Sequence, residues 1–456
     1  MRVLIEQRLK KIMSKRFGRR KFLLYGSAGL GTSLLLKACA GNESANTAQS
    51  QGNSQTQQAA SSSGSGDTIK VGILHSLTGT MAISETTLVD AEKLAIKQIN
   101  EAGGVLGKQI EPIVEDGASD WPTFAEKASK LIEQDNVATV FGCWTSASRK
   151  AVLPVFESKN HMLWYPVQYE GQECSKNVFY TGAAPNQQIQ PAVNWMLENE
   201  GKQFYLIGSD YVFPRTANTI VKQQLQAKGG EVVGEDYIPL GSTEVTPLIT
   251  KIRAALPNGG VIFNTLNGDS NAAFFKQLQG AGLGPDKYPV MSSSIAEVEV
   301  KQIGAEYLQG HYAAWNYFMT VDNPKNQQWV DAFKAEYGED RLTNDPMESA
   351  YNMVYLWKQS AEKAGIAENL EKVRSAAYGQ TLQEAPQGKV TMNPNHHASQ
   401  LVRIGRVRED GLFEIVNATD STVEPEPWNE FVPATQGYAC NWSDSNKGGK
   451  YKVKGT

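Results

Sequence analysis

From Ile69 onward, short apolar runs alternate with longer segments in which apolar residues recur at helical spacing. Short apolar runs bounded by Gly-rich breaks are typical of buried strands, and the helical spacing is typical of helices that cover a sheet. The predicted strands span 69–75, 109–116 and 137–142, and the predicted helices span 85–104 and 121–134. This strand–helix–strand order predicts a parallel sheet flanked by helices.

A second series of the same kind begins near Gln203. Its predicted strands are 203–210, 231–238, 261–266 and 288–294, and its predicted helices are 213–228, 245–255 and 269–280. The last part of the chain adds predicted helices over 327–337 and 346–364 and strand-like segments over 401–410 and 412–417. Two such series predict an α/β protein with two lobes, and the chain is long enough for two full-sized cores.

The first 38 residues have the layout of an export signal. Nine Lys or Arg and one acidic residue, Glu6, precede an apolar run over 22–36. As a helix this run would cover roughly 22 Å, which is short of the ~30 Å hydrocarbon core of a bilayer. Arg19 and Arg20 resemble a twin-arginine signal for folded export, and ordinary unfolded export is the alternative.

The segment Leu36–Cys39 resembles a lipoprotein processing box, in which Cys39 becomes the lipidated first residue of the mature protein. Lys37 departs from that pattern, and an incidental cysteine in a discarded signal is the alternative. Residues 40–67 contain no aromatic or branched aliphatic residue, so residues 39–67 are predicted to be a flexible tether with a reach of roughly 30 Å. This arrangement predicts a globule held beside a membrane in the periplasm.

Charge and cysteine content narrow the functional classes. The net charge of the whole chain is -4 even with the basic signal included, so nucleic acid is a poor partner. Four cysteines occur, at positions 39, 143, 174 and 440, without a CxxC pair. If Cys39 is lipidated, an odd number remains, and the sequence leaves open whether Cys174 and Cys440 form a disulfide.

Six loops that follow predicted strands are rich in hydroxyl, amide and aromatic groups. They span 75–85, 142–150, 164–171, 208–214, 265–270 and 292–300. Ligands of open parallel sheets bind beyond the carboxyl ends of strands, where helix N-termini supply donors. These loops are therefore predicted to ring a cleft between the two lobes.

The segments GTMAISE (79–85), SRKAVLPVFE (148–157), YPVQYEG (165–171) and GAAPNQQ (182–188) resemble the amide and urea branch of the branched-chain amino acid binding protein family. Within that branch, the similarity is greatest to the urea-binding subunits of urea ABC transporters. The resemblance covers about 69–417. It implies a two-lobed type I periplasmic binding protein, each lobe a mainly parallel sheet flanked by helices, with three crossovers between the lobes.

The crossovers are expected near Gly182, Phe318 and Gln380, which divides the chain into five parts. These are 1–38, 39–67, a first lobe of 68–182 plus 319–380, a second lobe of 183–318 plus 381–440, and a tail of 441–456. The resemblance further implies capture of urea or a small amide and delivery to an ABC permease. Cys39 predicts attachment to the inner membrane through a lipid anchor, and no cofactor is expected.

Urea has four N–H donors and one carbonyl, so a site that desolvates it must supply several acceptors and one or two donors. The Thr145–Ser148 segment opens a predicted helix with free N–H groups, and the resemblance assigns ligand contact to Ser146. The remaining candidates supply acceptors and flat walls. They are Trp144, Thr145, Tyr165, Tyr169, Asp210, Tyr211, Asn267, Asp269 and Glu85, with Glu170 as a further acceptor. Each carboxylate is equally well interpreted as a helix cap or a surface charge.

Single features of the sequence bear on anion binding, metal binding, hydrolysis and sensing as other functions. Arg149 and Lys150 are predicted to form outward salt bridges rather than an anion site, and the five histidines, His396 and His397 included, show no metal spacing. Amide hydrolysis would need an activated nucleophile and a base, but the sequence has no GxSxG or HExxH motif. Cys143 is the single thiol in a candidate loop. A cytoplasmic amide sensor stays open as a function, and so does a binding protein for short aliphatic amides or branched-chain amino acids.

Overall fold

The computed structural model describes residues 68–445 and 449–453. The first sheet is parallel throughout and has the order β2-β1-β3-β4-β5. Its strands are β1 (Ile69–His75), β2 (Ile110–Asp116), β3 (Val140–Gly142), β4 (Leu163–Tyr165) and β5 (Val178–Tyr180). The helices between these strands are α2 (Ala82–Glu101), α3 (Trp121–Glu133) and α4 (Ser146–Ser158).

The second sheet has seven strands in the order β15-β14-β10-β9-β8-β6-β7. Five strands run parallel: β6 (Gln203–Ser209), β7 (Glu231–Ile238), β8 (Val261–Thr265), β9 (Val290–Ser292) and β10 (Tyr312–Trp315). β14 (Arg403–Val407) and β15 (Phe413–Ala418) add an antiparallel edge. Its helical elements are η1 (Pro185–Gln187), α5 (Ile189–Asn199), α6 (Val212–Lys228), α7 (Thr246–Ala255), α8 (Ser270–Gly280), α9 (Glu297–Ile303) and α10 (Ala305–Leu308).

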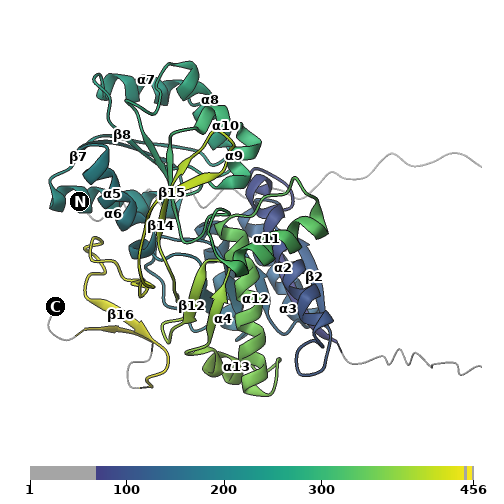
Figure 1. The fold of residues 1–456 in the computed structure, drawn as a ribbon. Helices are drawn as coiled ribbons and strands as arrows, with labels where there is room; N and C mark the ends of the chain where they lie inside the picture. The colour runs from purple at the N-terminus through teal and green to yellow at the C-terminus, as the bar shows by residue number, and fades with distance from the viewer. Residues whose placement is uncertain (1–67, 446–448, 454–456) are drawn as a thin grey trace, which may run out of the picture. The chain divides into compact units, whose positions relative to one another are not determined.

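Later segments return to the first lobe. They comprise α11 (Pro324–Tyr337), α12 (Asp345–Ala364), α13 (Leu370–Ala377) and a small sheet of β11 (Thr381–Ala385), β12 (Gly388–Met392) and β13 (Ala398–Ser399). Figure 1 shows α11, α12 and α13 beside α2, α3 and α4, whereas α7 to α10 gather with the second sheet. The α/β class with two mainly parallel sheets flanked by helices is confirmed.

The crossovers follow from where strands end. Gly182 follows β5 and Phe318 follows β10, and these are the positions of the first two predicted crossovers. The third crossing differs from the expectation near Gln380. Ala385, Val390, Met392 and Ala398 pack in the core of the first lobe, and the chain joins the second sheet only at β14. The third crossing therefore falls after Ser399, because the β11–β13 sheet buries its apolar side chains against the first lobe.

The C-terminal segment also has more structure than a simple tail. β16 (Tyr438–Asn441) pairs with β17 (Gly449–Lys452), and Cys440 of β16 forms a disulfide with Cys174 of the first lobe. Cys143 is a free, buried cysteine. Predictions for Arg19, Arg20, Cys39 and the tether fall outside the described residues.

No helix within residues 68–445 or 449–453 combines the length and apolarity that a membrane span needs.

Candidate functional site

The loops beyond the carboxyl ends of the two sheets meet one another. Trp144, after β3, donates from Nε1 to Asn267 Oδ1, after β8, at 3.4 Å. Gln168, after β4, donates from Nε2 to the carbonyl of Ser293, after β9, at 2.8 Å. All four residues are buried. The lobes are thus closed on each other, and the predicted ring of strand-end loops is brought together from both sides.

Ser146 is the first residue of α4, and Thr145 is its N-cap. Thr145 Oγ1 accepts from the N–H of Ser148 at 2.9 Å, so its hydroxyl serves the helix. The first N–H groups of a helix have no partner within it. Those of Ser146 and Ala147 are therefore available to an oxygen placed at the start of α4, and the positive end of the helix dipole favours such an oxygen.

Gly142 allows this loop to lie close to the end of β1. Its φ is +154°, and a Cβ atom there would lie 2.1 Å from the carbonyl oxygen of Leu74. Cys143 follows with φ 66° and donates its N–H to the same carbonyl at 2.9 Å. Burial raises the pKa of the Cys143 thiol far above its usual range, which opposes formation of a nucleophilic thiolate.

Arg149 lies behind the loop and is fully buried, so the predicted outward salt bridge is wrong. Its Nε donates to Glu173 Oε1 at 2.9 Å, and its Nη1 donates to the Ser146 hydroxyl at 3.1 Å. Ser146 in turn donates to Glu170, whose other oxygen lies 3.6 Å from Arg149 Nη2. The helical position alone did not reveal this, because the loop over 164–175 folds back over α4 and covers it.

Two further contacts complete this ion cluster. Lys150 Nζ, 36% exposed, donates to Glu173 Oε2 at 2.8 Å, and the Tyr180 hydroxyl donates to Glu173 Oε1 at 2.6 Å. Burial by itself would raise the pKa of Glu173, but Arg149 and Lys150 hold it far below its usual range. Because every carboxylate here is held by these cations, Arg149 has little capacity to bind an additional anion.

The predicted aromatic residues of the first lobe have two different positions. Tyr165 donates from its hydroxyl to the Trp144 carbonyl at 2.5 Å and thereby fixes the Trp144 loop. Tyr169 instead stacks on Tyr180 with ring centroids 4.9 Å apart, and its hydroxyl is 2.5 Å from His397 Nε2. Tyr165 thus borders the Ser146 loop, whereas Tyr169 supports it from behind.

Glu85 lies at the start of α2 and is buried. Its Oε2 accepts the N–H of Ser76 at 2.7 Å and is 3.4 Å from His75 Nδ1. His75 Nε2 pairs with Glu92 Oε1 at 2.8 Å. Burial opposes protonation of His75, but Glu92 and Glu85 together raise its pKa to about 9. A protonated His75 therefore holds the Glu85 carboxylate in place below the cleft.

In the second lobe, Tyr211 and Asn267 are buried and face the first lobe, whereas the side chains of Asp210 and Asp269 are exposed. Tyr211 is buried, and its ring centroid lies 6.5 Å from that of Trp121 in the first lobe. Asp210 is 47% exposed and pairs with Arg215 on the surface. The Asp269 side chain is exposed, and only its N–H reaches the first lobe, at Thr80 Oγ1. Asp210 precedes α6 and Asp269 is the N-cap of α8, and both side chains are exposed.

Burial raises the pKa of Tyr211 well above its usual range, and Tyr165 and Glu170 raise it further. The ring contact with Trp121 places Tyr211 at the boundary between the lobes. Trp144, Ser146, Tyr165, Tyr211 and Asn267 together form what we call the cleft group.

A cross-lobe contact that sequence reasoning missed joins α2 to α9. The Ser84 hydroxyl donates to Glu299 Oε1 at 2.6 Å, and Glu299 Oε2 accepts the N–H of Ala296 at 3.1 Å. Glu299 is almost fully buried by this contact, and burial raises its pKa to about 7 although the Ser84 hydrogen bond lowers it. The sequence marks 292–300 as a strand-end loop, but nothing in that segment indicates which carboxylate meets the opposite lobe.

This contact predicts that closure depends on pH. Lobe opening would return water to Glu299 and lower its pKa, so the closed form binds a proton more tightly. Ligand affinity is expected to be highest below about pH 4.3, the ordinary pKa of a glutamate, and to fall as the pH rises through about 7. Titration calorimetry across this range checks it. Glu299→Gln should flatten the profile, whereas Glu306→Gln, at an exposed carboxylate on α10, should not; an unchanged slope in Glu299→Gln would contradict the prediction.

No cluster of three or more His, Cys, Asp or Glu side chains within 68–445 and 449–453 is arranged to hold a metal ion. His396 and His397 are both buried, and desolvation lowers the pKa of each. They stack on Phe179 and Tyr180, respectively, with centroids 4.1 and 4.2 Å apart. Their positions are those of packing residues.

Comparison with known proteins supports the architecture. The family described as periplasmic binding protein domain matches residues 69–434. A leucine-, isoleucine-, valine-, threonine- and alanine-binding protein of Pseudomonas aeruginosa is 27% identical over 341 residues, which are 73% of this chain and 87% of that protein. A protein named limonene hydroxylase of Geobacillus stearothermophilus is 30% identical over 125 residues, but the match spans only 27% of this chain and 23% of that protein.

Solved structures show the same fold. A solute-binding protein of an ABC transporter from R. palustris, in complex with benzoate, superposes with a TM-score of 0.71 at 19% identity and covers 79% of this chain and 99% of its own. A branched-chain amino acid binding protein from Streptococcus pneumoniae, in complex with isoleucine, superposes with a TM-score of 0.67 at 21% identity, covering 79% and 100%.

Proposed function

The chain belongs to the periplasmic binding protein family, and we propose that it captures urea, or a closely related short amide, between its lobes and delivers it to an ABC permease. Members of the family are solute-binding proteins rather than enzymes. The disulfide between Cys174 and Cys440 is consistent with the extracytoplasmic location of the family, since disulfides persist in oxidising compartments. Anchoring through Cys39 and export through Arg19 and Arg20 are part of this proposal.

The observation that carries the ligand assignment is the neutralised cation beside Ser146. Arg149 is committed to Glu173, Glu170 and the Ser146 hydroxyl, so a ligand carboxylate would find no free cation there. A neutral carbonyl suits the N–H groups at the start of α4. The amino groups of urea would then face acceptors such as Glu85 and Asn267, and Tyr165 and Tyr211 would cover its flat faces.

A branched-chain or other amino acid is the second candidate, because the P. aeruginosa relative is named for such ligands. Titration calorimetry with urea, acetamide, formamide and leucine separates the candidates. Heat with urea and none with leucine supports the proposal. The absence of heat with urea, with a clear signal for leucine, would instead assign the cleft to amino acids.

Ser146→Ala is expected to weaken urea binding by about 1 to 3 kcal/mol, because it removes a buried hydroxyl and leaves its hydrogen-bond partners unsatisfied. Calorimetry measures the change. Ser158→Ala is the matched control, since Ser158 lies on the same helix at its exposed end. Equal affinities for both variants would remove Ser146 from the site.

A further inference from the structure

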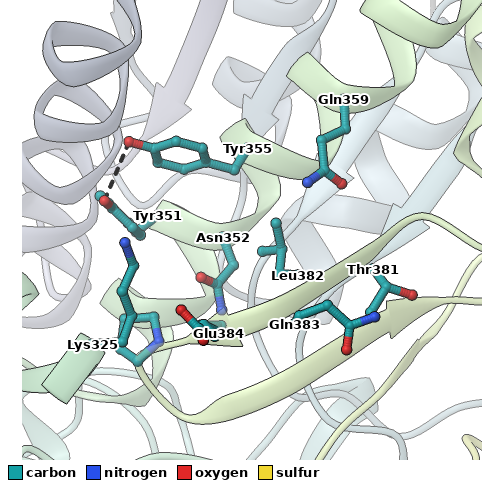
Figure 2. A pocket seen from close by; sticks show the side chains of 11 residues that line it. Lys325, Tyr351, Asn352, Tyr355, Gln359, Thr381, Leu382, Gln383 and Glu384 are labelled. Carbon is teal, nitrogen blue, oxygen red and sulfur yellow. Dashed lines mark hydrogen bonds between the residues drawn. The ribbon is translucent and has the colours of Figure 1, made fainter. Parts of the chain in front are cut away.

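A cavity lies in the first lobe, away from the cleft group. It has a volume of about 340 Å³ and is bounded by α12, β11 and the start of α11 (Figure 2). Small-molecule sites commonly enclose about 300 to 1,000 Å³, so the volume suits a compact ligand. The cleft residues do not line it. Its lining is Lys325, Tyr351, Asn352, Tyr355, Gln359, Thr381, Leu382, Gln383, Glu384, Ala385 and Pro386.

The floor of this cavity is rigid and offers hydrogen-bond acceptors. The hydroxyls of Tyr351 and Tyr355 both donate to Gln98 Oε1, at 2.6 and 3.0 Å, which fixes the two rings side by side. Asn352 is 2% exposed and uses its Nδ2 to donate to Glu348, which leaves its Oδ1 without a partner among the described residues. Gln359 Oε1 is likewise buried and unpaired within the described part of the chain.

The rim carries one charge of each sign. Lys325 and Glu384 are exposed, and neither forms an ion pair with any residue of 68–445 or 449–453. Figure 2 shows Lys325, Glu384 and Asn352 toward one end of the cavity and Gln359 toward the other. A ligand that matches this rim has a carboxylate for Lys325 and an ammonium group for Glu384.

We propose that this cavity binds a free α-amino acid whose side chain ends in a hydrogen-bond donor, such as an amide. Its ammonium and carboxylate groups pair with Glu384 and Lys325 at the rim. Its terminal amide N–H groups reach Gln359 Oε1, a buried oxygen whose unpaired state is otherwise costly. The Tyr351 and Tyr355 rings cover the aliphatic part of the ligand.

Hydrogen bonds connect this site to the crossings between the lobes. Asn352 donates to Glu348 Oε1 at 2.6 Å, and Glu348 accepts the Gln387 N–H at 3.0 Å. The Gln387 carbonyl accepts from Arg403 Nη2 at 2.8 Å, and Arg403 also donates to the carbonyl of Asn316. Asn316 and Arg403 lie at the second and third crossings. Occupancy of the cavity is therefore expected to change the affinity of the cleft for its own ligand.

Calorimetry and ligand-observed NMR with L-glutamine test the site in the full chain. Glutamine should bind with and without saturating urea, and L-leucine should bind at least about tenfold more weakly because it lacks the amide. Lys325→Met and Glu384→Gln, both at exposed positions, should each weaken glutamine binding by about tenfold. Lys334→Met, on the same helix as Lys325 but outside the cavity, should leave it unchanged.

Ser146→Ala separates this inference from the proposed function, since it should weaken urea binding and leave glutamine binding intact. The inference is overturned if glutamine does not bind, if both rim variants bind it normally, or if Ser146→Ala abolishes its binding. If glutamine binds the cavity, saturating glutamine should shift the urea affinity by about fivefold or more, a typical allosteric coupling. No shift would overturn the connection to the crossings and leave the site itself standing.

Discussion

Replacing Arg149 with methionine is expected to lower the free energy of unfolding by about 3 to 5 kcal/mol, because it leaves buried carboxylates without their main counter-ion. Glu173 and Glu170 are both buried, and Lys150 alone would remain near them. Methionine keeps a similar length and apolar bulk, so the loss reports charge rather than a cavity. Thermal unfolding in urea-free buffer and guanidinium titration measure it, since urea is the proposed ligand.

The control for this prediction is Lys150→Met on the same helix. Lys150 also pairs with Glu173, but it is 36% exposed, so its loss should cost about 1 kcal/mol or less. The pKa of Glu173 is depressed in the fold, so its ionised form contributes stability above its ordinary pKa, and this contribution disappears on acidification. The gap between wild type and Arg149→Met should therefore narrow below about pH 4.3. A gap equal to that of Lys150→Met at neutral pH would contradict the cluster's role.

Reduction of the disulfide between Cys174 and Cys440 is expected to cost about 2 to 5 kcal/mol of stability. The two residues are 266 positions apart, so the bond closes a large part of the described chain into one loop. Without it, the unfolded chain gains conformational freedom, and the β16–β17 hairpin loses its covalent link to the first lobe. The melting temperature with and without dithiothreitol measures the effect.

Cys440→Ser provides the matched comparison. Its melting temperature should be low in both buffers, whereas that of the wild type should fall to the same value only on reduction. Peptide mapping under non-reducing conditions should recover the linked 174–440 peptides from the wild type. A reductant effect of equal size in Cys440→Ser would assign the stabilisation to another cause.

Contacts within the first lobe and contacts between the lobes are expected to affect ligand binding in different ways. Arg149 and the disulfide hold the Ser146 loop and its surroundings in one lobe, so they affect ligand affinity through the stability of that lobe. The Ser84–Glu299 and Trp144–Asn267 hydrogen bonds join the two lobes and depend on closure. Variants of Arg149 or of the disulfide should therefore change both stability and binding. Variants of the two inter-lobe hydrogen bonds should change binding and its pH dependence, with little change in stability.

The periodicity of apolar residues predicts much of the fold. β1 and β7 begin and end where the sequence pattern places them, and the glycine after a helical pattern marks the end of α6 at Lys228. Local patterns succeed here because strands within a sheet and helices that cover it bury their apolar side chains at regular spacings. The sequence pattern gives no bounds for the short strands β4 and β5 and the β11–β13 sheet, because runs of two to five residues carry too little periodicity.

Two lobes, the strand-end loops and the residue types available to a small polar ligand are all visible in the amino-acid sequence. Which of those residues meet is visible only in the folded chain. Local sequence could not distinguish Tyr165 at the cleft from Tyr169 behind it, or Glu299 in the interface from Asp210 in water. The physical reason is that burial and charge pairing depend on segments far apart in the chain, such as 164–175 folding over α4, and no local pattern encodes those contacts.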